Sequence, residues 1–306
     1  MDSSGSVNAT TADEYVYGGT ADWRTDLYQY SCPAIPTHKE SIELIGSYGA
    51  KFTPELKEAS VEMPYEGNFT QEMYAQKMID EYIELGISPD NVWPQSFNSD
   101  DVIYWINKTD YGKQAVALDD KYEATEEEFR AWHSMLQENG VKIVAPPMWM
   151  LVTYDADADL GISPSAYAQS AQEHALDIIT WTLERTNPGL AGDDAWYWES
   201  LQEMELTDGD KYSLLQVLSD DIGILGIFSD WPATVTFFAN CMGISLRDNV
   251  TTEEGATTDE SAVDISGTTD ESAVDVNSES SQNAGGRRHL QAATRIFSVA
   301  LRLIGF

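Results

Sequence analysis

Short apolar runs alternate with amphipathic stretches between Ile35 and about Ile244. Six of these runs are bounded by Gly, Pro or acidic turn residues, and several are too continuously apolar to be half-exposed. The pattern therefore predicts six strands that are largely buried. They span Ala50–Lys57, Val92–Phe97, Gln114–Leu118, Lys142–Ala145, Leu176–Trp181 and Gly226–Ser229.

Amphipathic helices are predicted between these strands. Tyr74, Met78 and Tyr82 form one stripe, which follows the 3.6-residue period of an α-helix. Thr125 followed by Glu128 is typical of a capping box at the start of a helix. The predicted helices span Glu72–Leu85, Ser99–Ile106, Thr125–Asn139, Ser165–His174, Lys211–Leu218 and Trp231–Met242, with Gly140 well placed to end the third.

Six strand–helix units in a row favour a parallel sheet with outer helices. A closed barrel of this kind has eight strand–helix units in about 250 residues. The six units predicted here are two short of that number. The alternative is a doubly wound open sheet. Neither G-x-G-x-x-G nor G-x-x-x-x-G-K-[ST] is present to support nucleotide binding in such a sheet.

The chain of 306 residues is strongly acidic, with 52 Asp and Glu against 17 Lys and Arg, a formal net charge of −35. Because 42% of its residues are hydrophobic, it can bury a sizeable core, which argues against global disorder. The charge argues against nucleic acid and anionic membrane surfaces as partners of the whole chain. It is compatible with a divalent cation, or with a saline exterior.

The ends of the chain differ in composition from the strand–helix region at residues 35–245. Residues 1–34 are rich in Ser, Thr and Gly, which predicts an extended loop, and residues 246–286 form an acidic spacer that contains TTDESAVD twice. Residues 287–306 are basic and then apolar, and after the small residues Asn283–Gly286 they resemble a lipid-anchor signal. The alternative is a short basic amphipathic tail. The apolar part of residues 287–306 is too short to span a bilayer. We therefore expect the protein to associate with a membrane only if it carries such a lipid anchor.

Cysteines, the first residues and glycan acceptor sequences indicate whether the protein enters the secretory route. Only Cys32 and Cys241 occur, which excludes a disulfide framework and a cysteine-built zinc site but leaves one bridge open. The first residues contain neither the basic start nor the apolar core of a signal peptide. Asn-x-Ser/Thr sequences, which favour the secretory route, begin at Asn8, Asn68, Asn107 and Asn249. We expect a secreted or cell-surface protein.

The most informative candidate chemistry lies at the carboxyl end of the first predicted strand. Glu55 and Lys57 are two residues apart, so both side chains point to the same face of a strand. In a barrel they would face the mouth, where Glu55 can bind a hard divalent cation and Lys57 can neutralise a developing oxyanion. The alternative interpretation is a surface ion pair at the end of a strand.

Two further strand ends carry candidate binding residues. Gln95 can donate an amide hydrogen bond to a ligand oxygen, and Trp181 can present a flat apolar wall to a carbon skeleton. The alternative for Trp181 is core packing. Trp196 and Trp198 lie in a long segment, 186–210, that forms a lid or packs on the barrel. None of the four histidines, His38, His133, His174 and His289, lies at a strand's carboxyl end, so none is a persuasive general acid or base.

Five segments together resemble the glycerophosphodiester phosphodiesterase family. They are Ile35-Pro-Thr-His-Lys-Glu-Ser-Ile-Glu-Leu44, Thr53-Pro-Glu-Leu-Lys57, Val92-Trp-Pro-Gln-Ser-Phe97, Ile178-Ile-Thr-Trp-Thr182 and Gly226-Ile-Phe-Ser-Asp-Trp-Pro232. The resemblance implies a (β/α)8 TIM barrel of the PLC-like phosphodiesterase type, with about six of its eight units in this chain. It also implies hydrolysis of glycerophosphodiesters to sn-glycerol 3-phosphate and an alcohol, with a divalent cation, Ca²⁺ or Mg²⁺. By this resemblance Glu55 is a metal ligand, Lys57 is the catalytic lysine beside the phosphate, and Gln95 and Trp181 contact the substrate.

The family motifs that should precede Ile35 are missing. Residues 1–34 contain no Gly-His-Arg-Gly, no Glu-x-Asp and no His-Asp, which in the family supply two catalytic histidines and two metal ligands. We therefore expect the chain to be a truncated copy of an active enzyme and to be inactive alone. The rival hypothesis is a non-catalytic, acidic, extracellular binding or surface protein on a degenerate barrel. A third is a related barrel phospholipase that acts on lysophospholipids or inositol lipids.

Overall fold

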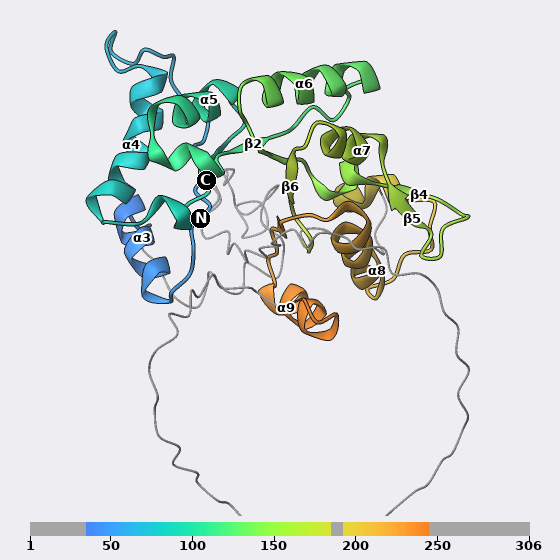
Figure 1. Ribbon diagram of the computed structural model, residues 1–306. Helices are drawn as coiled ribbons and strands as arrows, with labels where there is room; N and C mark the ends of the chain where they lie inside the picture. Colours follow the sequence, from blue (N-terminus) through green and yellow to red (C-terminus); the bar gives the residue numbers. More distant parts are fainter. Residues whose placement is uncertain (1–34, 185–191, 245–306) are drawn as a thin grey trace, which may run out of the picture. The chain divides into compact units, whose positions relative to one another are not determined.

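The computed structural model describes residues 35–184 and 192–244 (Figure 1). The expectations for residues 1–34, for the acidic spacer and for the carboxyl-terminal tail lie outside these residues. So do Cys32 and the acceptor residues Asn8 and Asn249. In the part of the chain that is described, no helix is long and apolar enough to cross a membrane.

A parallel sheet forms the centre of the fold, and its strands follow chain order. The five strands are β1 (Gln95–Ser96), β2 (Val116–Leu118), β3 (Ile143–Ala145), β6 (Asp177–Thr180) and β7 (Gly226–Ile227), with neighbours in the order β1-β2-β3-β6-β7. Parallel bridges from Phe52 to Val92 and from Glu55 to Gln95 add a sixth segment beside β1. All six predicted strand regions thus lie side by side in one sheet.

Helices lie before, between and after the strand segments, and those between them connect successive strands. They are α3 (His38–Ser47), α4 (Gln71–Glu84), α5 (Ser99–Lys108), α6 (Glu126–Glu138), α7 (Ala166–Glu173), α8 (Asp210–Gln216) and α9 (Pro232–Cys241), and they follow one another around the strands (Figure 1). A doubly wound sheet reverses its strand order at a switch point, and this sheet shows no reversal. The sequential order is the one that a βα-barrel requires, although the described residues do not close a barrel.

Local sequence signals explain the helix boundaries. Thr125 accepts a hydrogen bond from the backbone N–H of Glu128, and the Glu128 carboxylate accepts one from the N–H of Thr125, which confirms the capping box of α6. Gly140, with φ of 79°, follows the last turn of α6, as the sequence predicted. On α4 the predicted stripe is buried at Met78 and Tyr82.

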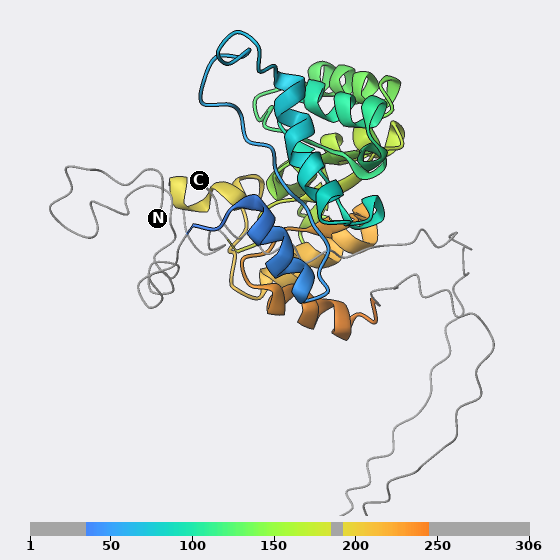
Figure 2. The same cartoon turned by 90° about the vertical axis from the view of Figure 1, so that its left-hand side faces the viewer.

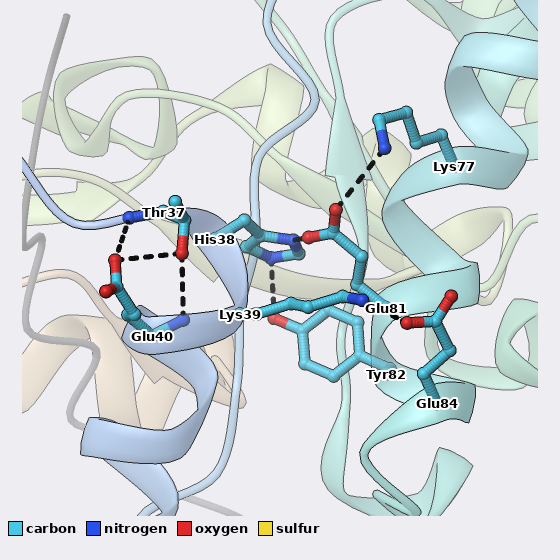
Figure 3. A network of polar contacts seen from close by, with 8 residues as sticks. All are labelled: Thr37, His38, Lys39, Glu40, Lys77, Glu81, Tyr82 and Glu84. Carbon is cyan, nitrogen blue, oxygen red and sulfur yellow. Dashed lines mark hydrogen bonds and ion pairs between the residues drawn. The ribbon is translucent and has the colours of Figure 1, made fainter.

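A polar network joins α3 and α4 (Figure 3). Thr37 and Glu40 form the capping box of α3. His38, the first residue of α3, contacts Glu81 of α4, with 2.7 Å between His38 Nδ1 and Glu81 Oε2. The other ring nitrogen of His38 lies 3.4 Å from the Tyr82 hydroxyl. His38 therefore holds α3 against α4, which leaves it in a helix–helix contact rather than at the carboxyl end of a strand.

Several short elements were not predicted from the sequence. They are the 3₁₀ turns η1 (Pro89–Asn91), η2 (Asp110–Gln114), η3 (Met148–Leu151) and η4 (Gly192–Leu201), the π-helical turn η5 (Val217–Ile222), and the antiparallel pair β4 (Val152–Tyr154) and β5 (Ile162–Pro164). From the sequence, the segment 186–210, which contains η4, could form a lid or pack on the barrel. Trp198 is 0% exposed and Tyr197 is also buried, so this part of the segment packs as core.

Candidate functional site

The carboxyl ends of the parallel strands meet at one edge of the sheet, which we call the carboxyl edge. Residues that follow the strands there are Glu55 and Lys57, Phe97, Asp119, Trp149, Trp181 with Glu184, and Ser229. Ligands of α/β proteins bind at this edge, because the connecting loops bring side chains from several strands together. The sequence predicted three of the site residues here: Glu55, Lys57 and Trp181.

Glu55 and Lys57 form an ion pair, with 2.7 Å between Lys57 Nζ and Glu55 Oε1. The Glu55 side chain is only 11% exposed, whereas that of Lys57 is 49% exposed. The contact agrees with the prediction that both side chains share one face of the strand. Because the lysine of this pair is half-exposed to solvent, the attraction is screened and contributes little to stability.

Gln95 lies beside this pair but directs its amide into the sheet. Its backbone N–H donates to the carbonyl of Pro54 and its carbonyl accepts from Leu56, so β1 registers Gln95 against Glu55. Its side chain is buried, and Nε2 donates to the carbonyl of Thr53 at 3.3 Å. This hydrogen bond is a structural role that the sequence did not reveal.

Trp181 belongs to a group of six rings at the carboxyl edge, in which it contacts Phe97, Trp196 and Tyr197. Its indole N–H donates to the carbonyl of Ala145 at 2.8 Å, and its ring centroid lies 6.1 Å from that of Phe97. We call this group the aromatic cluster; it comprises Phe97, Tyr122, Trp149, Trp181, Trp196 and Tyr197. Phe97 and Tyr122 are exposed while Trp181 is buried, so the cluster presents a partly exposed apolar surface above a packed base.

Two acidic residues at this edge have structural partners. Asp119 is fully buried and accepts a hydrogen bond of 2.5 Å from the Tyr167 hydroxyl. Glu184 accepts hydrogen bonds from the Ser229 hydroxyl, at 2.9 and 2.8 Å to its two oxygens, and from the backbone N–H of Asp230. Burial raises the pKa of the Glu184 carboxyl above its usual range, although the hydrogen bonds from Ser229 and the Trp231 backbone oppose this. Glu184 thus ties the end of β6 to the turn before α9.

Sequence reasoning missed Glu184. Its only signal was its place three residues after Trp181, beyond the end of a predicted strand. Its partner Ser229 lies 45 residues further along the chain, so no local pattern connects the two.

The described histidines lie on helices or, for His174, directly after the end of one. His38 belongs to the α3–α4 contact, and His174 follows the end of α7. His133 is fully buried in α6, where its Nδ1 lies 2.8 Å from the Ser170 hydroxyl. None of these three lies at the carboxyl edge, and His289 is outside the described residues.

A divalent cation does not fit the described residues alone. Among residues 35–184 and 192–244, no three His, Cys, Asp or Glu side chains lie close enough together to hold a metal ion. A hard cation of this kind takes about six oxygen ligands, of which Glu55 would supply one carboxylate. The described part of the carboxyl edge therefore offers a lysine, a carboxylate and an aromatic surface, but not a complete metal site.

Comparison with known proteins relates the chain to one extracellular protein. No family model matches it. A solved structure from Silicibacter pomeroyi DSS-3, described as a glycerophosphoryl diester phosphodiesterase, is 13% identical with a TM-score of 0.43; the match covers 68% of this chain and 57% of that one. Similarity at that level is too low to support a conclusion about fold or activity. A protein of Arthroderma benhamiae (strain ATCC MYA-4681 / CBS 112371) named "Extracellular protein" is 42% identical over 243 residues, which cover 77% of this chain and 97% of that protein. The chain belongs to the same family as this extracellular protein.

Proposed function

We propose that the protein is an extracellular phosphodiester hydrolase of the glycerophosphodiester phosphodiesterase type, with its site at the carboxyl edge. The observation that carries this proposal is the Glu55–Lys57 pair, 2.7 Å apart, at the carboxyl end of the first segment of a sequentially ordered parallel sheet. The name of the Arthroderma benhamiae relative supports the extracellular location. The motif resemblance of this segment supports the reaction class.

Lys57 is the group that suits a phosphodiester. A protein with a net charge of −35 repels anions at long range, so an anionic ligand needs a local cation to bind. The half-exposed ammonium of Lys57 can reach a phosphate oxygen in solvent, and the more buried Glu55 orients it. Lys121, another lysine near this edge, lies 3.6 Å from the centroid of the Trp132 ring, which restrains it.

The aromatic cluster suits the organic part of such a ligand. Its rings lie at the same edge as Lys57 and continue from Phe97 to Trp181, which are 6.1 Å apart. Flat, partly exposed rings bury the carbon atoms of glycerol or of an alcohol group without requiring a specific polar partner. The proposed ligand thus has its phosphate at Lys57 and its carbon skeleton on the cluster.

The dependence on Ca²⁺ or Mg²⁺ belongs to the proposal as well. Since the described residues do not complete a metal site, further ligands would have to come from residues outside them. The same holds for the general acid and base, because the described histidines lie away from this edge. The described side chains account for ligand binding rather than for proton transfer.

Replacing Lys57 with methionine is expected to weaken the binding of glycerophosphocholine at least tenfold. The variant removes a charge-assisted contact worth about 1.5–3 kcal/mol, and about 1.4 kcal/mol corresponds to a tenfold change in affinity. Titration calorimetry on the full chain measures this effect. Lys51→Met is the matched control, because Lys51 is an exposed lysine six residues earlier that lies over the Trp93 ring. Equal affinity of Lys57→Met and Lys51→Met would contradict the proposed site.

A second candidate function is ligand binding without catalysis. It is favoured by the lack, within the described residues, of a metal-binding group and of a histidine at the carboxyl edge. An assay for sn-glycerol 3-phosphate in the calorimetry samples separates the two functions. Release that depends on added Ca²⁺ or Mg²⁺ and is lost in Lys57→Met supports the hydrolase, whereas binding without release supports the binding protein.

A further inference from the structure

A tight exposed hairpin lies in the loop that leads from Lys57 to α4. Tyr65 and Phe69 pair in antiparallel fashion, with N–O distances of 2.8 and 3.0 Å in the two directions. Glu66 and Gly67 form the turn with φ values of 51° and 80°, a left-handed conformation that glycine adopts without strain. The loop stands away from the helices beside the start of α4 (Figure 2).

The hairpin displays an acceptor sequence together with an aromatic ring. Asn68-Phe69-Thr70 is an N-glycan acceptor, and Asn68 is exposed at the end of the turn. Tyr65, three residues earlier, is 46% exposed although it is a large aromatic residue. The backbone N–H of Asn68 donates to the carbonyl of Tyr65 at 3.3 Å, so the turn holds the two residues close together.

We infer that Asn68 carries an N-linked glycan whose first sugar packs against the ring of Tyr65. The inference rests on the extracellular location in the proposed function. In the transfer, Asn68 Nδ2 forms a bond to C1 of N-acetylglucosamine on a lipid-linked oligosaccharide diphosphate. The C1–O bond to the diphosphate breaks, the lipid diphosphate leaves, and the amide loses one proton.

The packing explains why a large ring is exposed at this position. One face of a pyranose carries several C–H groups and is apolar, so a flat aromatic ring covers it and removes apolar surface of both partners from water. A two-stranded hairpin is marginally stable on its own, and contact with a sugar adds a constraint across the turn. The glycan therefore stabilises the loop that begins at Lys57.

Asn107 provides an internal comparison. Asn107-Lys108-Thr109 is also an acceptor sequence with an exposed asparagine, but it lies in the last turn of α5. The threonine hydroxyls do not distinguish the two sites, because Thr109 donates to the carbonyl of Trp105 at 2.9 Å and Thr70 accepts from the backbone N–H of Met73 at 3.2 Å. Tyr104 stands three positions before Asn107, but it is partly buried against the core and its hydroxyl donates to the Gln76 side chain of α4 at 2.9 Å. Because this ring is held against α4, the stabilisation inferred for Asn68 is not expected there.

Site occupancy tests the first part of the inference. The full chain, fused to a cleavable secretory leader, is produced in a eukaryotic host and treated with peptide N-glycosidase in heavy-oxygen water before mass spectrometry. We expect Asn68 to be labelled in most molecules and Asn68→Gln to lose one glycan relative to the native sequence. Glycans at other acceptors with Asn68 unmodified would overturn this inference alone. A secreted chain without any glycan would overturn it while leaving the phosphodiester site to be judged by the Lys57 titration.

Thermal unfolding tests the contact with Tyr65. Enzymatic removal of the glycan is expected to lower the melting temperature of the native sequence by about 2 °C, and to leave that of Tyr65→Ser unchanged. Tyr48→Ser is the matched control, because Tyr48 is 81% exposed and lies far from the acceptor in sequence. This control should keep the full shift on glycan removal. An equal shift in native protein and in Tyr65→Ser would overturn the packing of the sugar on this ring.

Discussion

Replacing Trp105 with alanine is expected to lower the free energy of unfolding by about 3–5 kcal/mol. Trp105 lies on α5 and is 0% exposed, and its indole N–H donates to the carbonyl of Ala75 on α4 at 3.1 Å. The substitution leaves a large cavity and removes the indole hydrogen bond between the two helices, two costs that add. Urea unfolding followed by circular dichroism measures the change.

The matched control for this prediction is Tyr48→Ala. Tyr48 is also aromatic but is 81% exposed, so its loss is expected to change stability by less than about 0.5 kcal/mol. Similar effects of the two substitutions would show that α5 does not pack against α4 as described.

The buried His133 is expected to make the fold less stable as the pH falls from about 6.5 to about 4. Burial, with smaller effects from His174 and Arg130, lowers the pKa of His133 from 6.5 to about 4. Between these values the unfolded chain binds a proton that the folded protein excludes, so stability is lost as the pH decreases. This contribution is fully present above about pH 6.5 and amounts to about 3 kcal/mol, because one pKa unit corresponds to about 1.4 kcal/mol.

The difference between native protein and a His133→Phe variant isolates this effect. Carboxylates throughout the chain also change stability in this pH range, but they contribute equally to both proteins. Phenylalanine keeps a ring beside Tyr167 and leaves the Ser170 hydroxyl without its histidine partner, a cost that does not depend on pH. Unfolding free energies measured from pH 7 to pH 4 should converge for the two proteins. Curves that stay parallel would contradict a neutral, buried His133.

The strand–helix units were predictable because their signals are local. Helix α6 shows this, since its start depends on Thr125 and Glu128, three residues apart, and its end on Gly140. Strands such as β2 and β3 are short apolar runs that are buried throughout. By contrast, η4 and the β4–β5 pair depend on contacts with distant segments, as when Trp196 packs against Tyr122 with 5.2 Å between ring centroids.

The candidate site was predictable only in part for the same reason. The two-residue spacing of Glu55 and Lys57 was sufficient to place both side chains on one face, and their 2.7 Å contact agrees with this. The alternative of an ion pair at a strand end remains an accurate description of that contact. The cluster around Trp181 could not be predicted, because its rings come from the ends of four strands and from η4. Glu184 was missed because its partners lie beyond β7.

Phosphorus NMR of glycerophosphocholine mixed with the full chain tests the central claim most directly, because one spectrum reports both binding and hydrolysis. If Lys57 and Glu55 form part of a phosphodiester site, the phosphodiester resonance broadens with the native protein and stays narrow with Lys57→Met. A phosphomonoester resonance that appears with Ca²⁺ or Mg²⁺ would show hydrolysis at the same site. A resonance of equal width and position with both proteins, and no phosphomonoester, would contradict the account.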